Sequence, residues 1–225
     1  MAFLDTIIWR PMPTDQYMTV ETSKEQIYLH HTAGSSNPYE VFTWWQSTTE
    51  RVGTAFVIGG PTTSTTWIDG QIVQGFSSKM WAWHLGVTVK DLLTNGKSST
   101  WLNSHSVGIE LCNWGQLTQK NGTYVNYQGG TVPEDQVVTY DAPFRGYTHY
   151  HKYSDAQLES TRQLLIYLGQ TWNIDITYKG IEMFDINPRC LMGEGGVWTH
   201  CSVRPTPEKF DLNPQPNLLS MLSTL

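Results

Sequence analysis

The sequence is poor in basic residues, with 14 Lys and Arg against 20 Asp and Glu, and its formal net charge is −6. Nucleic acids and anionic membrane surfaces both repel an acidic protein, so we expect neither as a partner. The chain also lacks an apolar run long enough to span a bilayer. Its 225 residues are sufficient for one sizeable domain with a real core, and we expect a single domain and a monomer.

Cysteine is scarce as well. Cys112, Cys190 and Cys201 are an odd number, and their spacing matches no zinc-ribbon pattern. We therefore expect free thiols, made in a reducing compartment. Residues 1–10 have no basic leader and are interrupted by Asp5, so they do not have the pattern of a signal peptide, and we expect synthesis in the cytoplasm.

Hydrophobic periodicity predicts an α/β domain with a central mixed β-sheet flanked by helices. Residues 26–30 alternate, which indicates a half-buried strand with His30 on the face opposite Leu29. A strand over 106–112 places Glu110 on the face opposite Val107. Further expected elements are helices over 38–50, from 155 to about 172 and over 218–222, strands over 55–58 and 197–200, and an antiparallel hairpin over 66–73 with an Asp-Gly turn. Residues 113–150 show little periodicity and are expected to form long loops or an irregular hairpin.

Three stretches far apart in the chain place candidate metal ligands or acid/base groups at strand ends or in polar loops. They are residues 28–34 with His30, residues 106–111 with Glu110, and His200 followed by the polar loop 207–211. Together they offer two imidazoles, carboxylates and a lysine. Zinc-assisted hydrolysis of an amide requires such a set, because the metal needs an open position and the water needs a base.

These stretches occur in the order seen in a known family. His30-His31-Thr32-Ala33-Gly34, Trp83-His84 with Gly86, residues 107–111, and His200 with Lys209-Phe210-Asp211 resemble the zinc-dependent N-acetylmuramoyl-L-alanine amidases, which include animal peptidoglycan recognition proteins. The resemblance runs from about residue 26 to residue 211. It implies Zn²⁺ as cofactor, bacterial peptidoglycan as partner, and hydrolysis of the amide between N-acetylmuramic acid and L-alanine.

The resemblance also implies the zinc ligands, which are His30, His200 and a third group. Cys201, Glu208 and Asp211 are all chemically able to bind zinc. Some branches place a cysteine eight residues after the second histidine, where this chain has Glu208. Others end in Lys-x-Asp, which matches residues 209–211, and we therefore favour Asp211, with Glu208 as the alternative.

The same resemblance assigns the remaining roles. Glu110 would be the general base, and Lys209 would stabilise the oxyanion. His84, Trp83 and Thr54 are expected to contact substrate. Thr54 stands where lysozyme-type members have a catalytic tyrosine, so the base function is expected to have moved to Glu110.

Two other functions remain open from the sequence. One is a catalytically silent peptidoglycan-binding module. The other is a sugar-binding or glycosidase domain that uses Glu110 and Asp69 as a carboxylate pair. Within the amidase interpretation, residues 1–225 form one catalytic domain with a core from about 26 to 222 and no separate cell-wall-binding domain. Without a signal peptide such an enzyme reaches the wall after release from the host cell, as a phage endolysin does.

Overall fold

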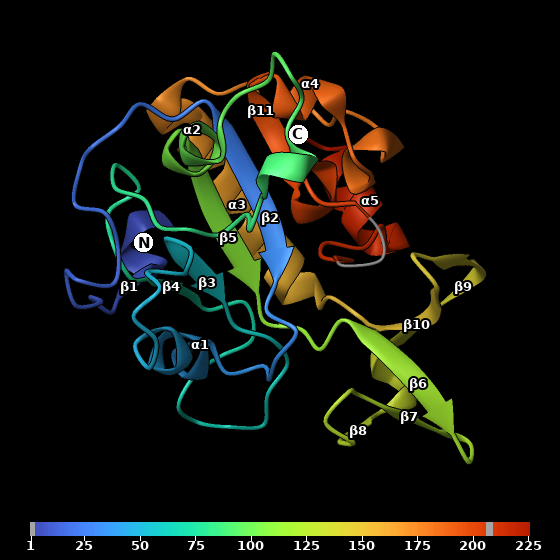
Figure 1. The fold of residues 1–225 in the computed structure, drawn as a ribbon. Coiled ribbons are helices and arrows are strands. Elements are labelled where there is room, and N and C mark those ends of the chain that lie inside the picture. Colours follow the sequence, from blue (N-terminus) through green and yellow to red (C-terminus); the bar gives the residue numbers. More distant parts are fainter. Residues whose placement is uncertain (1–2, 206–208) are drawn as a thin grey trace.

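The centre of the molecule is a six-stranded sheet with strand order β1-β4-β3-β5-β2-β11 (Figure 1). The computed structural model describes residues 3–205 and 209–225. Every neighbouring pair is parallel except the antiparallel pair β3–β4. The predicted mixed sheet is confirmed. The strands are β1 (Ile8–Trp9), β2 (Gln26–His31), β3 (Phe56–Ile58), β4 (Ile72–Gln74), β5 (Ser106–Leu111) and β11 (Gly196–Thr199).

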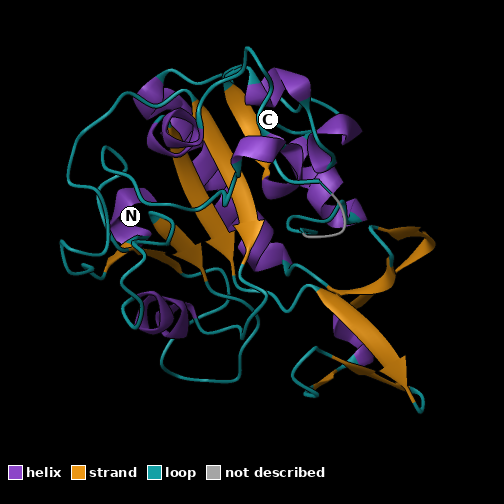
Figure 2. Ribbon diagram, in the orientation of Figure 1, coloured by secondary structure: helices purple, strands orange, loops and turns teal. Residues whose placement is uncertain are grey.

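Helices flank this sheet, and the longest of them lies behind it in the view of Figure 2. That helix, α3, carries four buried leucines, Leu158, Leu164, Leu165 and Leu168, as its periodicity predicts. The α-helices are α1 (Pro38–Trp45), α2 (Ser99–Ser104), α3 (Asp155–Trp172), α4 (Pro188–Leu191) and α5 (Pro216–Leu222). Short 3-10 helices span Phe3–Thr6, Val89–Asp91, Glu134–Gln136, Ile181–Phe184 and His200–Ser202. No helix in the described ranges is both long and apolar enough to cross a bilayer.

Strand β2 lies between β5 and β11 in the sheet, and all six of its residues are buried. The sequence predicted a half-buried strand, which is wrong because both faces of β2 are covered. Parallel sheets are commonly buried on both sides in this way. The polar residues on β2, including His30 and His31, therefore depend on partners inside the protein.

Two other expectations fail in the first half of the chain. Helix α1 ends at Trp45 instead of continuing to residue 50. The hairpin over 66–73 does not form, and only Ile72–Gln74 is a strand there. Within that range the backbone N–H of Ile68 donates to the side-chain oxygen of Gln71 at 3.1 Å, and the backbone N–H of Gln71 donates to the carbonyl oxygen of Ile68 at 3.0 Å. Such local bonds compete with a strand ladder and explain the irregular segment.

A second sheet, five-stranded and antiparallel, projects from the body in Figure 1. We call residues 116–151 the arm. For residues 113–150 the sequence predicted long loops or an irregular hairpin, whereas the arm has five paired strands. Most of its side chains are exposed or half-buried, so they show no strong apolar alternation that could have predicted its strands. Its strand order is β8-β7-β6-β10-β9, with β6 (Gln116–Lys120), β7 (Thr123–Val125), β8 (Thr131–Val132), β9 (Val137–Phe144) and β10 (Tyr147–His151).

Helix α3 begins with a complete capping box, as predicted. The Ser154 hydroxyl accepts from the backbone N–H of Gln157, whose side chain accepts in return from the backbone N–H of Ser154. The same hydroxyl donates to the Asp69 carboxylate at 2.6 Å. These bonds satisfy helix N–H groups that have no partner within the helix.

We expect Ser154→Ala to lower the free energy of unfolding by about 1 kcal/mol, because it removes the cap of the helix that covers the sheet. Urea unfolding of the purified protein measures this change. Gln170→Ala, at an exposed position of the same helix, is the matched control and should have little effect. Equal stabilities of the two variants would contradict the importance of the cap.

Candidate metal and catalytic site

Strand register brings the predicted site residues together at the carboxyl ends of β2, β5 and β11. His30 on β2 pairs with Glu110 on β5, and Leu29 pairs with Thr199 on β11. Partners in register on parallel strands point to the same face, so His30 and Glu110 share one face of the sheet. His200 follows directly after β11 and lies beside His30. The ends of parallel strands are the common position of binding sites in open α/β sheets.

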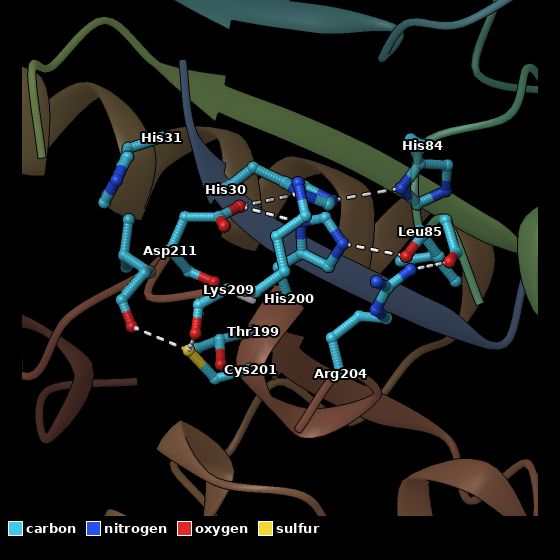
Figure 3. Close-up of polar contacts among 12 residues, drawn as sticks. His30, His31, His84, Leu85, Thr199, His200, Cys201, Arg204, Lys209 and Asp211 are labelled. Carbon is cyan, nitrogen blue, oxygen red and sulfur yellow. Dashed lines mark hydrogen bonds and ion pairs between the residues drawn. The ribbon is translucent and has the colours of Figure 1, made fainter. Parts of the chain in front are cut away.

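Three ligand atoms converge at this point (Figure 3). The Nδ1 atoms of His30 and His200 are 2.9 Å apart. One carboxylate oxygen of Asp211, Oδ2, lies 2.7 Å from His200 Nδ1 and 3.4 Å from His30 Nδ1. All three residues are buried, and they are the one group of this kind among the described residues whose ligand atoms lie within 4.8 Å of one another.

The chemistry of these atoms suits a cation. His200 Nε2 lies 2.8 Å from the carbonyl oxygen of Leu85, which can only accept, so Nε2 carries the proton and Nδ1 of the neutral ring has a free lone pair. The Asp211 carboxylate places a further oxygen, Oδ2, at the same point, beside the Nδ1 atoms of His200 and His30. Acceptors that converge without a donor between them repel unless a positive charge joins them. Two histidines and a carboxylate fit zinc with one position left open.

The residues around Asp211 explain why it occupies this place. Cys201 is not part of the cluster, and its sulfur contacts the backbone carbonyl of Asp211 at 3.4 Å. The ring of Phe210 packs against the rings of His31 and Tyr147. The alternative ligand, Glu208, lies outside the described residues.

The two adjacent histidines of β2 have different partners. His30 contacts His200 and Asp211, whereas Nδ1 of His31 lies 2.9 Å from the Tyr153 hydroxyl. The Tyr153 hydroxyl also accepts from the side-chain amide of Asn213 at 3.0 Å. His31 therefore ties β2 to the segment that follows Asp211, and only His30 of the pair reaches the cluster.

Glu110 lines the same groove as His200 and Asp211 and is partly buried. Its Oε2 atom is buried and has no hydrogen-bond partner among the described residues. Burial, together with the charge of Asp211, raises the pKa of Glu110 to about 8, although Lys209 acts in the opposite direction. A carboxyl group whose pKa lies close to neutral pH, with a free oxygen at a groove, is suited to take up and to release a proton.

The groove has a volume of about 750 Å³ and contains most of the predicted site residues. Trp83, His84, Glu110 and Lys209 line it together with His200 and Asp211. Two strongly exposed aromatic side chains also line it, Trp44 on α1 at 62% exposure and Tyr127 in the arm at 61%.

Thr54 does not reach the groove. It is 1% exposed, and its hydroxyl donates to the backbone carbonyl of Phe56 at 2.9 Å. Its methyl group lies against Gly108, where a β-carbon on Gly108 would come within 2.5 Å of it. The predicted contact between Thr54 and substrate is therefore not supported by its position, which is beneath the groove.

Arg145, which connects the arm to the loop carrying Lys209, was not among the residues predicted from the sequence. Its side chain is 3% exposed and lies at the turn between β9 and β10. The guanidinium donates to the carbonyl oxygens of Cys201, Arg204 and Lys209 and pairs with Asp185 at 2.9 Å. A single arginine in an irregular segment has no distinguishing pattern, so only the fold reveals this contact.

Comparison with known proteins identifies the family. A family profile described as N-acetylmuramoyl-L-alanine amidase matches residues 21–209, and the chain belongs to this family. The match includes His30, His84, Glu110 and His200 but ends before Asp211. No curated protein sequence matches the chain.

Solved structures share the fold at low sequence identity. A mutant form of PlyL is 14% identical with a TM-score of 0.50, over 95% of this chain and 90% of that one. The Staphylococcus aureus hydrolase AmiA, solved in complex with its ligand, is 11% identical with a TM-score of 0.50, over 96% of this chain and 80% of that one. These similarities confirm the predicted architecture.

We expect Asp211→Ala to be isolated largely without zinc and to be inactive. Loss of a group that only supports a ligand weakens metal binding by about 10- to 100-fold. Loss of a ligand itself should weaken it further. Metal analysis of the purified variants tests this, with Cys201→Ser and Glu208→Ala as controls that keep zinc. Full zinc occupancy in Asp211→Ala with loss in Glu208→Ala would transfer the role to Glu208.

Proposed function

We propose that the protein is a zinc-dependent amidase that hydrolyses the bond between the lactyl group of N-acetylmuramic acid and L-alanine in bacterial peptidoglycan. The observation that carries this proposal is the convergence of His30, His200 and Asp211 beside Glu110 in a groove. Membership of the N-acetylmuramoyl-L-alanine amidase family supplies the substrate class.

His30, His200 and Asp211 would hold the zinc ion. When bound, zinc supplies a Lewis acid that activates water and polarises the attacked carbonyl. Glu110 is suited to accept the proton of the attacking water, because its Oε2 atom has no other partner in the described structure and its pKa is raised to about 8. The protonated carboxyl then returns that proton to the leaving amine of L-alanine.

Lys209 supplies positive charge at the same groove. Its backbone carbonyl accepts from Arg145 at 2.5 Å, which ties the backbone at this residue to the arm. In the proposed reaction the Lys209 ammonium stabilises the oxyanion that forms as water attacks. A donor placed in this way typically contributes about 3 kcal/mol.

The walls of the groove suit a glycan-linked peptide. Trp44 and Tyr127 present exposed aromatic rings to the same groove as Glu110. Aromatic side chains combine a large apolar face with a polar edge, which favours contact with sugar rings and peptide. We therefore propose that the groove binds both the sugar and the stem peptide of the substrate.

The site geometry argues against the two alternative functions, the silent binding module and the glycosidase, for different reasons. A silent binding module would need no complete set of ligands and base, whereas the grouping of His30, His200 and Asp211 near Glu110 supports such a set. A glycosidase would need Glu110 and Asp69 to face each other across a substrate. Asp69 instead accepts from Ser154 at the start of α3 and is not among the residues that line the groove. A role in phage lysis stays a prediction from the sequence.

Replacement of the base should separate catalysis from metal binding. We expect Glu110→Gln to keep its zinc and fold while turnover falls by about a hundredfold or more, since the amide cannot accept the proton. Wall-lysis rates and metal content measured on the same preparation check this. Glu134→Gln, at an exposed carboxylate that does not line the groove, is the matched control and should stay within a few-fold of the parent. If Glu110→Gln lost its zinc, Glu110 would instead be a ligand.

The products of wall digestion identify the bond that is cut. Amide hydrolysis should release new L-alanine amino termini and leave the number of reducing sugar ends unchanged. Amino-terminal labelling and a reducing-sugar assay on purified peptidoglycan measure both. New reducing ends without new amino termini would show that the glycan is cut, and would overturn the amidase proposal.

A further inference from the structure

His84 has the position of a supporting residue for the metal site. Its Nδ1 atom lies 3.0 Å from Nε2 of His30, on the side of that ring away from the ligand cluster. On its other side, His84 Nε2 lies 2.9 Å from the hydroxyl of Ser106. The three side chains thus form a chain of hydrogen bonds that leads from the metal site to the beginning of β5.

The far end of this chain fixes the direction of every bond in it. The Ser106 hydroxyl donates to the backbone carbonyl of Leu102 at 2.6 Å, so it can only accept from His84. Nε2 of His84 therefore carries the proton, and Nδ1 of the neutral ring accepts. Nε2 of His30 must then donate to His84, which leaves the lone pair on His30 Nδ1 facing Asp211 and His200.

Leu85, the residue after His84, fixes the tautomer of His200 in the same way. The backbone carbonyl of Leu85 accepts from His200 Nε2 at 2.8 Å and leaves the lone pair on His200 Nδ1 (Figure 3). Two consecutive residues, His84 and Leu85, therefore orient the rings of both histidines.

This two-residue segment is itself held by Asn103. The Asn103 side-chain oxygen accepts from the backbone N–H groups of His84 and Leu85 at 2.8 and 3.1 Å, and Asn103 is fully buried. Gly108 provides the space for the His84 ring, because a β-carbon there would come within 3.0 Å of Nδ1. Hydrogen bonds therefore hold the backbone of this segment in place, and the absence of a side chain at Gly108 leaves room for the imidazole of His84.

We propose that the segment His84–Leu85 sets the tautomers of both metal-binding histidines, so that His84 is a positioning residue for zinc instead of a contact for substrate. The proposal rests on the zinc site described above but not on the reaction that the site catalyses. A fixed proton on the outer nitrogen presents the inner nitrogen to the metal and prevents the ring from rotating away.

The tautomers can be read directly from the protein as purified. Long-range proton–nitrogen NMR spectra of the histidine rings should show the proton on Nε2 in His30, His84 and His200. A proton on Nδ1 of His30 or His84 would overturn the proposal, whether or not the protein hydrolyses peptidoglycan. The measurement therefore distinguishes a failure of this inference from a failure of the proposed function.

Two substitutions at one position test the effect on zinc. Replacement by leucine removes the acceptor, whereas the side-chain oxygen of asparagine can take the place of Nδ1. We expect His84→Leu to weaken zinc binding by about 10- to 100-fold and His84→Asn to restore most of it, as measured by competition with a chromogenic chelator. His149→Leu, in the arm and away from the groove, is the control.

The outcomes are decisive in either direction. Parent-like zinc affinity in His84→Leu would overturn the proposal. Equal losses in the leucine and asparagine variants would also overturn it, because they would show that only the shape of the imidazole matters. Thermal unfolding of each variant verifies that the fold is retained, and the ring spectra of the parent decide the tautomers even if a variant does not fold.

Discussion

The site depends on the parallel, in-register pairing of β2 with β5 and β11. This pairing places His30 at the same height as Glu110 and on the same face, and it brings His200 alongside. A shift of one residue between β2 and β5 would turn every side chain of one strand to the opposite face. Leu29 and Ile109, which alternate with these polar residues, oppose such a shift because it would move them out of the apolar core and put polar side chains in their place. The hydrophobic core therefore maintains the geometry of the polar site.

Polar groups in a buried strand need partners, and two groups of residues in this protein provide them. His30, His200 and Asp211 converge as acceptors, which favours a cation between them. Behind them, the bonds of the segment His84–Leu85 determine which ring nitrogens face inward. Unsatisfied polar groups in a protein interior are costly, so the hydrogen bonds of the second group stabilise the orientation of the first.

Contacts from the rest of the chain complete the site. The arm contributes Arg145, whose guanidinium holds the carbonyl groups of the loop that leads to Asp211, and Tyr127, which lines the groove. On the opposite side of β2, His31 binds Tyr153 and thereby reaches Asn213. The loop with Lys209 and Asp211 is thus fixed from both of its ends, which positions two charged side chains at one groove.

The elements that the sequence predicted well are those with a strong and unambiguous period. Helix α3 shows its buried leucines and its Ser154 cap plainly, and β2, β5 and β11 follow from short apolar alternations. The hairpin over 66–73 was wrong because local hydrogen bonds between Ile68 and Gln71 replace the ladder there. The arm was missed because a sheet with largely exposed faces has no apolar alternation to detect.

The sequence by itself determined the fold class, the family resemblance and the residue types of the site, since these follow from periodicity and from motifs that stand within short segments. Tertiary structure alone decided that Thr54 lies beneath the groove, that Asp69 stays at the start of α3, and that His84 faces His30. It also placed Arg145 against a loop more than fifty residues further along the chain. The physical reason is that a side chain's partner across strands and loops depends on register and packing, and neither is encoded within any short stretch of sequence.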